Sequence, residues 1–457
     1  MSENIIVDSG RLAGTVTVPI SKSFLHRALI CRALSRLSRP DQDLDALWKI
    51  DMPDGLPNPV PVDISATMSC LRVLFSENKG VYQNRDFSDI AGAKIEETPE
   101  ELYRLHCHES GSTLRFFIPI AAALGKPVIY TGEGLLPERP LGEYADLFRD
   151  ASKGVSFQFL EKGRSLPLLV QGQLRPGRFE LPGNVSSQYI TGLLLALPLL
   201  EQDSEIVLTT ELESSAYVNI TLAVMKEFGI QVFCEENRYT IPGGQKYERQ
   251  IPYTSEADYS QAAFWLVLKY LGHEISVQNL PVSGLQGDGA IQKFLLGLEQ
   301  VRDGKIPQLP EGSSFQKSGD TPVLELNISQ VPDIVPVLAV AAAATPCITK
   351  FIRAGRLRIK ECDRLTATCE MLSAFGIKTV EEKDSFIVHG RIMDINHPDF
   401  IPACIHSRND HRMVMAASVA ATCTKGKTEI TDWHAVRKSY PAFFKDFRDL
   451  GGIAQQS

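Results

Sequence analysis

The stretch KECDRL places two cations and two acids within five residues, directly before an amphipathic run. Lys360 and Arg364 are four residues apart, so both side chains can point the same way from a helix. Glu361 and Asp363 supply the acids, and Asp363 can simply pair with a neighbouring cation. Charges with this spacing usually decorate a solvated helix face, and the alternative is that they face a ligand. The rest of the chain has to decide between these two interpretations.

A second group of polar side chains lies in PISKSFLHR, at the start of another helical stretch. Ser21 or Ser23 can cap this helix, and the free amides of a helix N-terminus attract anions. Lys22 stands at the same end, while Ser23 and Arg27 are four apart and share a face. Lysine, serine and arginine at one helix start suit phosphate or carboxylate. A capped helix with surface cations is the alternative.

Three further stretches place glycine, arginine or hydroxyl groups near the starts of apolar helices. In ESGSTLRFF, Gly111 lets a ligand approach the backbone, and a simple Ser/Thr cap is the alternative. In GEGLLPERPLGEY, Arg139 sits in a loop between an acid and a proline. In LPGNVSSQYITG, Ser186, Ser187 and Gln188 stand at a helix start, where neutral donors suit hydroxyls and phosphate oxygens.

The C-terminal half repeats this design with charged residues. Asp333 opens the apolar run VPDIVPVLAV, either as a partner of the helix dipole or as a base in a mostly dry cleft. Arg412 in NDHRMVMAAS and Lys438 in AVRKSYPAFF add two cations. Six helices with their N-termini at one cleft would give this acidic protein a positive interior.

The elements that must position these residues alternate along the chain. Buried helices are predicted, because of their small and apolar composition, for FLHRALICRAL, STLRFFIPIAAAL, YITGLLLALPLL, YSQAAFWLVLKYL, IVPVLAVAAAAT and RMVMAASVAATC. Strands are predicted for runs such as EIVLTT, PVLELN and SFIVHG. Turn-rich loops, MPDGLPNPVPVD and SENKGVYQNRDFSD, flank one more helix, ISATMSCLRVLF. Quasi-repeated units of roughly 60–70 residues predict an α/β or α+β fold with two domains of three units each.

Composition narrows the class of protein. The 457 residues are 44% hydrophobic and 22% charged, as in soluble globular proteins, and the net charge of −8 argues against a nucleic-acid-coating surface. Nine scattered cysteines without a CxxC pair suit a reducing compartment. The first residues resemble neither a signal nor a transit peptide, and the apolar runs fall short of a membrane span. We therefore expect a cytoplasmic protein without a membrane partner.

The HCH stretch at His106 to His108 contains residue types that bind metals. Successive residues of a strand point to opposite faces, and no second cluster accompanies this one. We therefore expect no metal site here.

Taken in order, these motifs resemble those of the 5-enolpyruvylshikimate 3-phosphate (EPSP) synthase family. SKSFLHRAL resembles the family's SKSxxNRAL, SGSTLR its AGTxxR, and ERPL its ERPI. SSQYITGLLLALP resembles SSQFxSALLLAAP, RIKECDRL resembles RVKESDRL, NDHRMVMA resembles NDHRMAMA, and KSYP resembles KSFP. Because the matches run from Pro19 to Phe444 in the family's order, the chain is identified as a member.

The resemblance implies a two-domain enolpyruvyl transferase fold, with three βαβαββ-type units in each domain and two hinge crossovers. Residues 20–254 would form the shikimate 3-phosphate side. Residues 1–19 plus 255–457 would form the second domain, so the first strand belongs with the C-terminal half. The family transfers the enolpyruvyl group of phosphoenolpyruvate to the 5-hydroxyl of shikimate 3-phosphate by addition–elimination and releases phosphate. This is a step of the shikimate pathway toward chorismate and the aromatic amino acids.

The same resemblance implies the partners. The substrates are two small molecules, no metal or organic cofactor takes part, no nucleic acid is bound, and a monomer is expected. The shikimate 3-phosphate site would comprise Lys22, Ser23, Arg27, Ser186, Ser187, Gln188, Ser214, Tyr217, Asp333 and Lys360. The phosphoenolpyruvate site would comprise Lys22, Gly111, Arg139, Gln188, Arg364, Arg412 and Lys438.

The resemblance also implies the catalytic roles. Asp333 would accept the proton of the 5-hydroxyl, and Lys22 or Glu361 would handle the proton at the enolpyruvyl methylene. The sequence leaves open which of the two acts in which step. Such chemistry needs an acid and a base around one pocket, with arginines and lysines to bind carboxylate and phosphate together. The same cations would stabilise the charge of a tetrahedral intermediate.

The chain departs from the family at several positions. Glu109, Arg356 and His26 each stand where the family has Asn, and DISAT replaces a DDxR-like segment. These departures bear on affinity and specificity, and the Asn contact at Arg356 is not carried over.

Two alternatives remain. The sister transferase that acts on UDP-N-acetylglucosamine opens with KNA and uses a loop cysteine, whereas this chain has SKS and no cysteine in GEGLLPERP. A non-catalytic paralogue is the other alternative. The retention of the catalytic candidates together with Arg412 and Lys438 argues against it.

Overall fold

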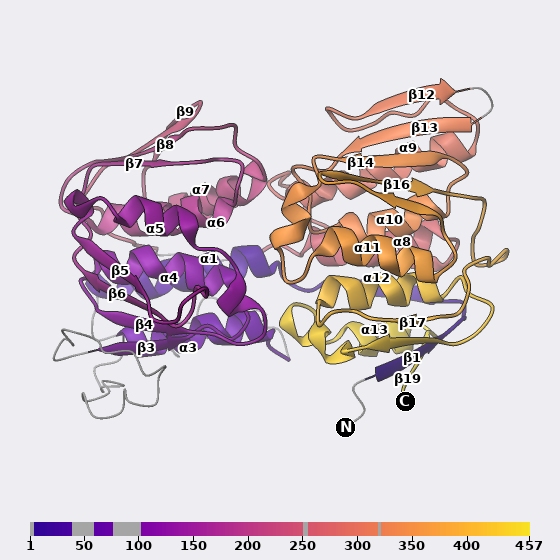
Figure 1. Cartoon of the computed structure of the whole chain (residues 1–457), viewed down its shortest axis with the longest axis horizontal. Coiled ribbons are helices and arrows are strands. Elements are labelled where there is room, and N and C mark those ends of the chain that lie inside the picture. The colour runs from indigo at the N-terminus through magenta and orange to yellow at the C-terminus, as the bar shows by residue number, and fades with distance from the viewer. Residues whose placement is uncertain (1–3, 39–58, 76–101, 250–254, 319–320) are drawn as a thin grey trace. The chain divides into compact units, whose positions relative to one another are not determined.

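A computed structural model describes residues 4–38, 59–75, 102–249, 255–318 and 321–457 (Figure 1). Contacts divide the chain into two compact units. We call Ser21–Ser255 the N-half unit, and Met1–Ile20 with Glu256–Ser457 the C-half unit. Of the two turn-rich loops predicted around the ISATMSCLRVLF helix, the first lies mostly and the second wholly outside the described residues.

The sheets of the N-half unit come from two βαβαββ segments. The first segment contains β3 (Tyr103–His106), α4 (Gly111–Ala123), β4 (Val128–Thr131), α5 (Gly142–Phe148), β5 (Val155–Phe159) and β6 (Leu168–Gly172). Its strands lie in the order β3-β4-β6-β5. β3 and β4 are parallel because a helix crosses between them, and the other pairs are antiparallel.

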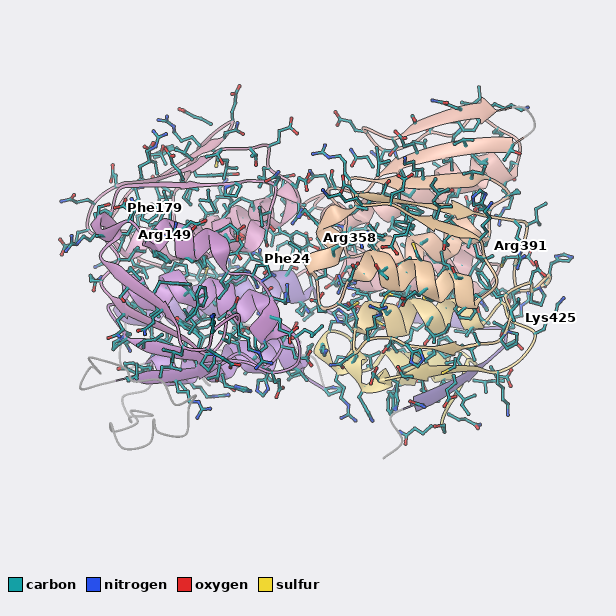
Figure 2. The ribbon with its side chains drawn as sticks, in the orientation of Figure 1. Phe24, Arg149, Phe179, Arg358, Arg391 and Lys425 are labelled. Atoms are coloured by element: carbon teal, nitrogen blue, oxygen red, sulfur yellow. The ribbon has the colours of Figure 1, made fainter. Side chains whose placement is uncertain are left out.

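The second segment repeats this topology. It contains β7 (Arg178–Leu181), α6 (Ser187–Ala196), β8 (Ser204–Leu208), α7 (Ser215–Glu227), β9 (Phe233–Glu235) and β10 (Arg238–Ile241). The strand order is β7-β8-β10-β9. Phe179 on β7 is fully buried in this unit, and Figure 2 labels it among the side chains.

Five of the helices described in the N-half unit pack into a closed ring. α1 (Lys22–Ser35) contacts α3 (Val62–Phe75) and α7, α7 contacts α6, α6 contacts α4, and α4 contacts α3. α4 and α6 are apolar nearly all round, and nearly all their residues are buried, as expected for helices at the centre of a unit.

The C-half unit uses the βαβαββ topology twice more. One segment contains β13 (Thr321–Asn327), α10 (Val335–Ala343), β14 (Ile348–Ile352), α11 (Arg364–Ala374), β15 (Thr379–Glu381) and β16 (Ser385–His389). β12 (Ser314–Ser318) extends its sheet to the order β12-β13-β14-β16-β15.

The second segment of this unit is completed by the N-terminus. It contains β17 (Cys404–Ile405), α12 (His411–Ala421), β18 (Thr428–Thr431), α13 (Phe443–Asp449) and β19 (Ile453–Gln456). β1 (Asn4–Asp8) lies between β18 and β19 and pairs with both in antiparallel fashion. β2 (Ala13–Thr17) pairs in parallel with β11 (Glu274–Gln278), which follows α8 (Tyr259–Tyr270) and precedes α9 (Ile291–Arg302).

The core of the C-half unit is centred on α10. This helix contacts α8, α9, α11 and α12, and each of its residues is buried. The run VPVLAVAAA has no polar face, so it is stable only when other elements surround it. In Figure 1, α10, α11 and α12 lie next to one another within this unit.

The six predicted buried helices are confirmed as α1, α4, α6, α8, α10 and α12, and the ISATMSCLRVLF helix is α3. The strand predictions for EIVLTT, PVLELN and SFIVHG are confirmed as β8, β13 and β16. The nine cysteines are free thiols, and all except Cys234 and Cys404 are buried. In the described part of the chain, no helix is both long enough and apolar enough to cross a membrane.

Candidate active site

In the C-half unit, one carboxylate is surrounded by three cations. Asp333 lies just before α10, and its Oδ1 is 2.9 Å from an Nη atom of Arg364 and 3.3 Å from Nζ of Lys360. Its Oδ2 is 3.4 Å from an Nη atom of Arg412. The Asp333 side chain is 22% exposed, so a small molecule can reach it. The sequence-predicted base and three predicted anion-binding cations therefore form one cluster.

This environment shifts the pKa of both partners. Burial alone would raise the pKa of Asp333, but Lys360, Arg412 and Arg364 together hold it well below its usual range. Burial lowers the pKa of Lys360, and the charges of Arg356 and Arg364 lower it further against the opposing effect of Asp333. In the substrate-free protein Asp333 is a stable carboxylate.

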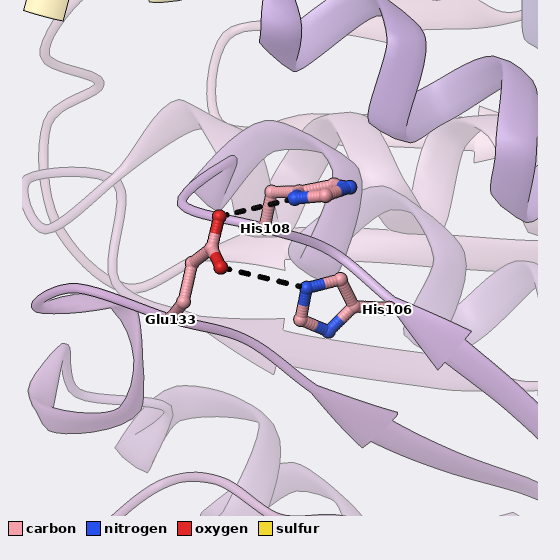
Figure 3. Close-up of side chains that lie close together, drawn as sticks. All are labelled: His106, His108 and Glu133. Carbon is pink, nitrogen blue, oxygen red and sulfur yellow. Dashed lines mark hydrogen bonds and ion pairs between the residues drawn. The ribbon is translucent and has the colours of Figure 1, made fainter. Parts of the chain in front are cut away.

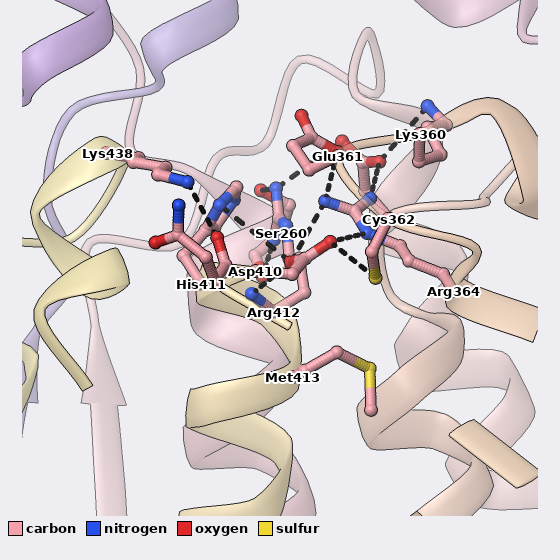
Figure 4. Close-up of polar contacts among 12 residues, drawn as sticks. Ser260, Lys360, Glu361, Cys362, Arg364, Asp410, His411, Arg412, Met413 and Lys438 are labelled. Carbon is pink, nitrogen blue, oxygen red and sulfur yellow. Dashed lines mark hydrogen bonds and ion pairs between the residues drawn. The ribbon is translucent and has the colours of Figure 1, made fainter. Parts of the chain in front are cut away.

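Arg364 is the centre of this cluster, and its side chain is 1% exposed (Figure 4). Its Nε donates to Oδ2 of Asp410 at 2.7 Å, and one Nη lies 2.5 Å from Oε2 of Glu361. The planar guanidinium thus holds three carboxylates in fixed directions, which lysine could not do. Glu361, the predicted proton-handling acid, is therefore fixed close to Asp333.

Within the C-half unit, the charged residues of KECDRL divide between two environments. Lys360, Glu361 and Arg364 join the Asp333 cluster, whereas Asp363 caps α11 and pairs with Arg358 at 2.8 Å. The interpretation of Asp363 as the partner of a neighbouring cation is confirmed.

Arg412 and Lys438 are held by hydrogen bonds to nearby residues, mainly to backbone carbonyl oxygens. The guanidinium of Arg412 donates to the carbonyl oxygen of Ser260 at 2.8 Å and to its Oγ at 2.9 Å. Nζ of Lys438, at the end of a short 3₁₀ helix (Trp433–Lys438), donates to the carbonyl oxygen of Asn409 at 2.6 Å. Asp410, next to Asn409, caps α12 by accepting from the amide of Arg412 at 2.8 Å.

These contacts bring together the N-terminal ends of α8, α10, α11 and α12. A helix N-terminus carries partial positive charge, so arginines placed there oppose the helix dipole. Capping acids, among them Asp258, Asp363 and Asp410, offset part of that charge. Four helix starts and several cations at one place favour the binding of an anion.

In the N-half unit, Lys22 starts α1 and pairs with α3. Its Nζ lies 2.6 Å from Oδ2 of Asp63, and the two side chains are 17% and 12% exposed. Of the two serines that could cap this helix, Ser21 occupies the N-cap position but makes no side-chain capping bond, and Ser23 lies inside the helix. The backbone carbonyl of Ser21 instead accepts from the amide of Leu25, which is the first turn of the helix itself.

The starts of α4 and α6 are joined through polar side chains. Ser186 caps α6 by accepting from the amide of Gln188 at 3.3 Å, and Ser187 is buried in the first turn. Nε2 of Gln188 donates to Oγ of Ser112 at 3.0 Å. Ser110 caps α4 by accepting from the amide of Thr113, so the cap reading of this segment is confirmed.

Gly111 is tightly enclosed by two guanidinium groups. A Cβ at this position would lie 2.6 Å from an Nη atom of Arg139 and 3.0 Å from one of Arg115. Arg115 is itself tied to the carbonyl oxygen of Pro140, next to Arg139, at 2.7 Å. A larger residue here would displace the arginine side chains that lie over the backbone of the helix start.

Arg27 of α1 is held by hydrogen bonds to its own helix and to α7. Its Nε donates to Oγ1 of Thr221 at 2.7 Å, and its Nη atoms donate to the carbonyl oxygens of Ser23 and Tyr217 at 2.7 and 3.1 Å. Ser214 lies just before α7 with a left-handed backbone, φ 55°, and is buried. The structure thus places Ser23, Arg27, Ser214 and Tyr217 around the packed ends of α1 and α7.

Sequence reasoning missed several residues of these clusters. Asp63 was overlooked because DISAT departs from the family pattern, although its acid is retained and pairs with Lys22. Asp410 belongs to the NDHRMVMA motif, but the motif alone does not indicate its role. Its position two residues before an arginine at a helix start is an N-cap signal that could have revealed it. Ser112 and Ser260 carry no sequence signal beyond their place at helix starts.

Comparisons with known proteins agree with this architecture. The sequence profile described as "EPSP synthase (3-phosphoshikimate 1-carboxyvinyltransferase)" matches residues 6–447. The chain is 38% identical to a 3-phosphoshikimate 1-carboxyvinyltransferase of Clostridium kluyveri, covering 98% of this chain and 97% of the relative. It is 36% identical to one of Clostridium perfringens, covering 99% and 100%.

Solved structures share the fold. An EPSP synthase from Acinetobacter baumannii aligns with a TM-score of 0.68 at 20% identity, covering 99% of this chain and 100% of that one. The enolpyruvyl transferase NikO from Streptomyces tendae aligns with a TM-score of 0.64 at 15% identity, covering 99% and 98%. The two-domain enolpyruvyl transferase fold predicted from the sequence is confirmed. By its profile match and its full-length relatives, this chain belongs to the EPSP synthase family.

Proposed function

We propose that this chain transfers the enolpyruvyl group of phosphoenolpyruvate to the 5-hydroxyl of shikimate 3-phosphate, with Asp333 as the base. Enolpyruvyl transfer between these substrates is the activity of the family to which the chain belongs. The observation that carries the assignment of roles is the cluster of Asp333 with Lys360, Arg364 and Arg412.

The low pKa of Asp333 makes it a weak base until substrates arrive. Its carboxylate is stabilised by the same three cations that would bind anionic substrates. Phosphate and carboxylate groups placed beside these cations would weaken their hold on Asp333 and raise its pKa. A base that gains strength only when both substrates are bound would protect phosphoenolpyruvate from attack by water.

The anionic groups of phosphoenolpyruvate would be bound by the forked arginines and by lysine. Arg364, Arg412 and Lys438 supply this charge in the C-half unit, and Lys22 and Arg139 supply it in the N-half unit, with Gly111 and Gln188 at the helix starts beside Arg139 and Ser112. Preorganised cations of this kind stabilise the charge of a tetrahedral intermediate without reorganising.

Shikimate 3-phosphate would bind mainly through hydroxyl and amide donors. The proposed contacts are Lys22, Ser23, Arg27, Ser186, Ser187, Gln188, Ser214 and Tyr217 in the N-half unit, with Asp333 and Lys360 acting on its 5-hydroxyl. Arg27 is held by several protein oxygens, which fix the direction of its guanidinium group.

The proton balance requires a second group. In the addition step, the 5-hydroxyl oxygen bonds to C2 of phosphoenolpyruvate, its proton goes to Asp333, and C3 gains a proton to become a methyl group. In the elimination step, that methyl group loses a proton and the C2–O bond to phosphate breaks. Glu361, paired with Arg364, and Lys22, paired with Asp63, are the candidates for giving and taking this proton.

All the proposed residues belong to one chain, so we infer that a monomer can carry out the reaction. We also infer that the reaction takes place in the cytoplasm and needs no metal or organic cofactor.

The function is tested by phosphate release with purified protein and three sets of substrates. Release is expected with phosphoenolpyruvate plus shikimate 3-phosphate, and not with phosphoenolpyruvate alone or with UDP-N-acetylglucosamine as acceptor. Release only in the set with phosphoenolpyruvate plus UDP-N-acetylglucosamine would assign the sister activity, and no release in any set would indicate a non-catalytic protein.

A further inference from the structure

Two histidines and a glutamate meet in the N-half unit where two parallel strands end. β3 and β4 pair in parallel with His106 opposite Thr131. The segments that follow them remain side by side, because the amide of Cys107 donates to the carbonyl oxygen of Thr131 at 2.8 Å and that of Glu133 donates to the carbonyl oxygen of His108 at 2.9 Å. His108 and Glu133 therefore face each other across a rigid backbone frame.

The two histidines of HCH lie on the same side of the chain, although the sequence led us to expect no metal site here. Successive residues alternate, so Cys107 is the residue that points away, and it is fully buried. His108 lies beyond the end of β3 and has a left-handed backbone, φ 49°. The two imidazole rings lie with their centroids 4.4 Å apart on the same side.

Each imidazole ring directs one nitrogen atom at the carboxylate of Glu133 (Figure 3). Nδ1 of His108 lies 3.0 Å from Oε1 of Glu133, and Nε2 of His106 lies 3.9 Å from Oε2 of the same carboxylate. One ligand atom from each residue falls within 4.8 Å of the other two. Ligands of a tetrahedral zinc ion lie about 3.4 Å apart, so small side-chain rotations would complete the geometry.

A further hydrogen bond orients one of the rings. Nδ1 of His106 lies 3.0 Å from Oγ1 of Thr131. When Nδ1–H donates to that hydroxyl, the lone pair is on Nε2, which is the atom that faces Glu133. Metal-binding histidines are commonly held by a partner of this kind on their other nitrogen. The side chains of His106, His108 and Glu133 are 41%, 39% and 56% exposed, so an ion can enter from solvent.

We propose that His106, His108 and Glu133 form a binding site for a divalent cation of the zinc class, with water in the remaining position. Two imidazoles and one carboxylate favour Zn²⁺ or Co²⁺ over Mg²⁺ and Ca²⁺, which prefer oxygen ligands alone. The site is separate from the residues assigned to the enolpyruvyl transfer and does not depend on that assignment.

The site would join two loops. His108 lies three residues before Gly111, and Glu133 lies six residues before Arg139. An ion that binds only the folded protein stabilises it in proportion to its concentration above the dissociation constant. Bound zinc is therefore expected to raise the melting temperature as well as to occupy the site.

The test uses tag-free, full-length protein treated with a chelator and titrated with Zn²⁺ by calorimetry. One Zn²⁺ per chain is expected, and H108N and E133Q should each weaken binding about tenfold or more. Asparagine tolerates the left-handed backbone at position 108, so this variant should fold. His397→Gln is the matched control, because His397 pairs with Asp394 at 3.2 Å on the surface but belongs to no three-residue group among the described residues.

Co²⁺ serves as a spectroscopic probe of the ligands. A spectrum of nitrogen and oxygen ligation, without a thiolate charge-transfer band, is expected and should disappear in both site variants. The proposal is overturned by any of three results. These are no saturable binding of Zn²⁺, equal binding by wild type, H108N and E133Q, or a thiolate band that assigns the ion to exposed Cys234 or Cys404.

Discussion

The pKa of Asp333, the proposed base, is lowered by the cations around it. Three cations contact this one carboxylate, and two of them have further partners in the same unit. Arg364 also pairs with Asp410, and Arg412 also donates to Ser260. The pKa of Asp333 is therefore set by groups that would themselves bind substrate. A neutral residue of the same shape would keep the packing and lose the base.

Asp333→Asn is expected to lower kcat by about 10²–10⁴-fold, because it removes the proposed general base. Turnover is measured by phosphate release, and folding by circular dichroism. The matched control is Asp363→Asn on the neighbouring stretch, which removes an ion pair, keeps a capping side chain and changes no proposed catalytic group. The role of Asp333 is contradicted if D333N stays folded and keeps more than about a tenth of wild-type turnover.

Lys360 gives a pH dependence with a defined sign. Burial and the charges of Arg356 and Arg364 lower its pKa from 10.5, so it loses its proton at lower pH than an ordinary lysine. If the protonated form binds substrate, kcat/KM falls as pH rises through this lowered pKa. Arg356→Asn removes one repelling cation, raises the pKa of Lys360 and should move the loss of activity to higher pH.

The control for this profile is Lys360→Arg, which keeps its charge throughout the range and should also move the alkaline loss upward. Profiles of kcat/KM against pH for wild type and both variants are compared. An alkaline limb at the same pH in all three would assign the titration to another group.

At the scale of elements, the helix starts explain why small residues are needed beside large cations. Gly111 occupies the first turn of α4, where an added Cβ would meet Arg139 and Arg115. Ser112 in the same turn accepts from Gln188, and Ser187 is buried in the first turn of α6. The departure from the family at His26 is explained by a buried chain of hydrogen-bonding side chains. His26 is buried in α1, and its Nδ1 lies 2.8 Å from Oγ1 of Thr67 on α3, which lies 2.8 Å from Oγ1 of Thr113 on α4.

Gly111→Ala should raise the KM for phosphoenolpyruvate roughly 10–100-fold, because the added methyl group displaces the guanidinium of Arg139 and removes a charged hydrogen bond worth about 1.5–3 kcal/mol. The KM for shikimate 3-phosphate should change less. Gly142→Ala is the matched control, since a Cβ there meets no atom within 4 Å. Equal rises in both KM values would separate Gly111 from the phosphoenolpyruvate site.

The hydroxyl chain that begins at His26 predicts a loss of stability. His26→Leu removes the partner of Thr67 inside the N-half unit and should lower the free energy of unfolding by about 1–3 kcal/mol. His26→Asn, which restores the family residue, should lose less because its amide can still bond to Thr67. Urea denaturation measures both variants. If H26N is as unstable as H26L, packing of the ring rather than the hydrogen bond explains the position.

How far the sequence could predict these elements depended on the kind of signal. Helices such as α10 and α12 were found because an apolar, small-residue run is a local pattern. The Lys22–Asp63 pair and the Arg364–Asp410 pair join residues 41 and 46 positions apart, and no local pattern reports such contacts. The contact of His108 with Glu133 likewise joins residues 25 positions apart, so the HCH stretch alone could not reveal the cluster.

At the scale of the whole molecule, an acidic chain builds local positive sites in both of its units. The net charge is −8, yet the predicted substrate residues of each unit lie at clustered helix starts rich in lysine and arginine. The motifs predicted the fold and the family because they occur in order along almost the whole chain. The roles proposed for individual residues of both units can be tested by following the protons of the reaction.

The most direct test is the reaction carried out in D₂O with phosphoenolpyruvate, shikimate 3-phosphate and purified protein, followed by NMR and phosphate assay. If the methylene carbon is protonated and then deprotonated, deuterium enters the vinyl group of the product while one phosphate is released per product formed. D333N should abolish both signals. Product without deuterium at that carbon would contradict addition–elimination by an acid and a base, and an absence of product with folded wild-type protein would contradict the proposed function itself.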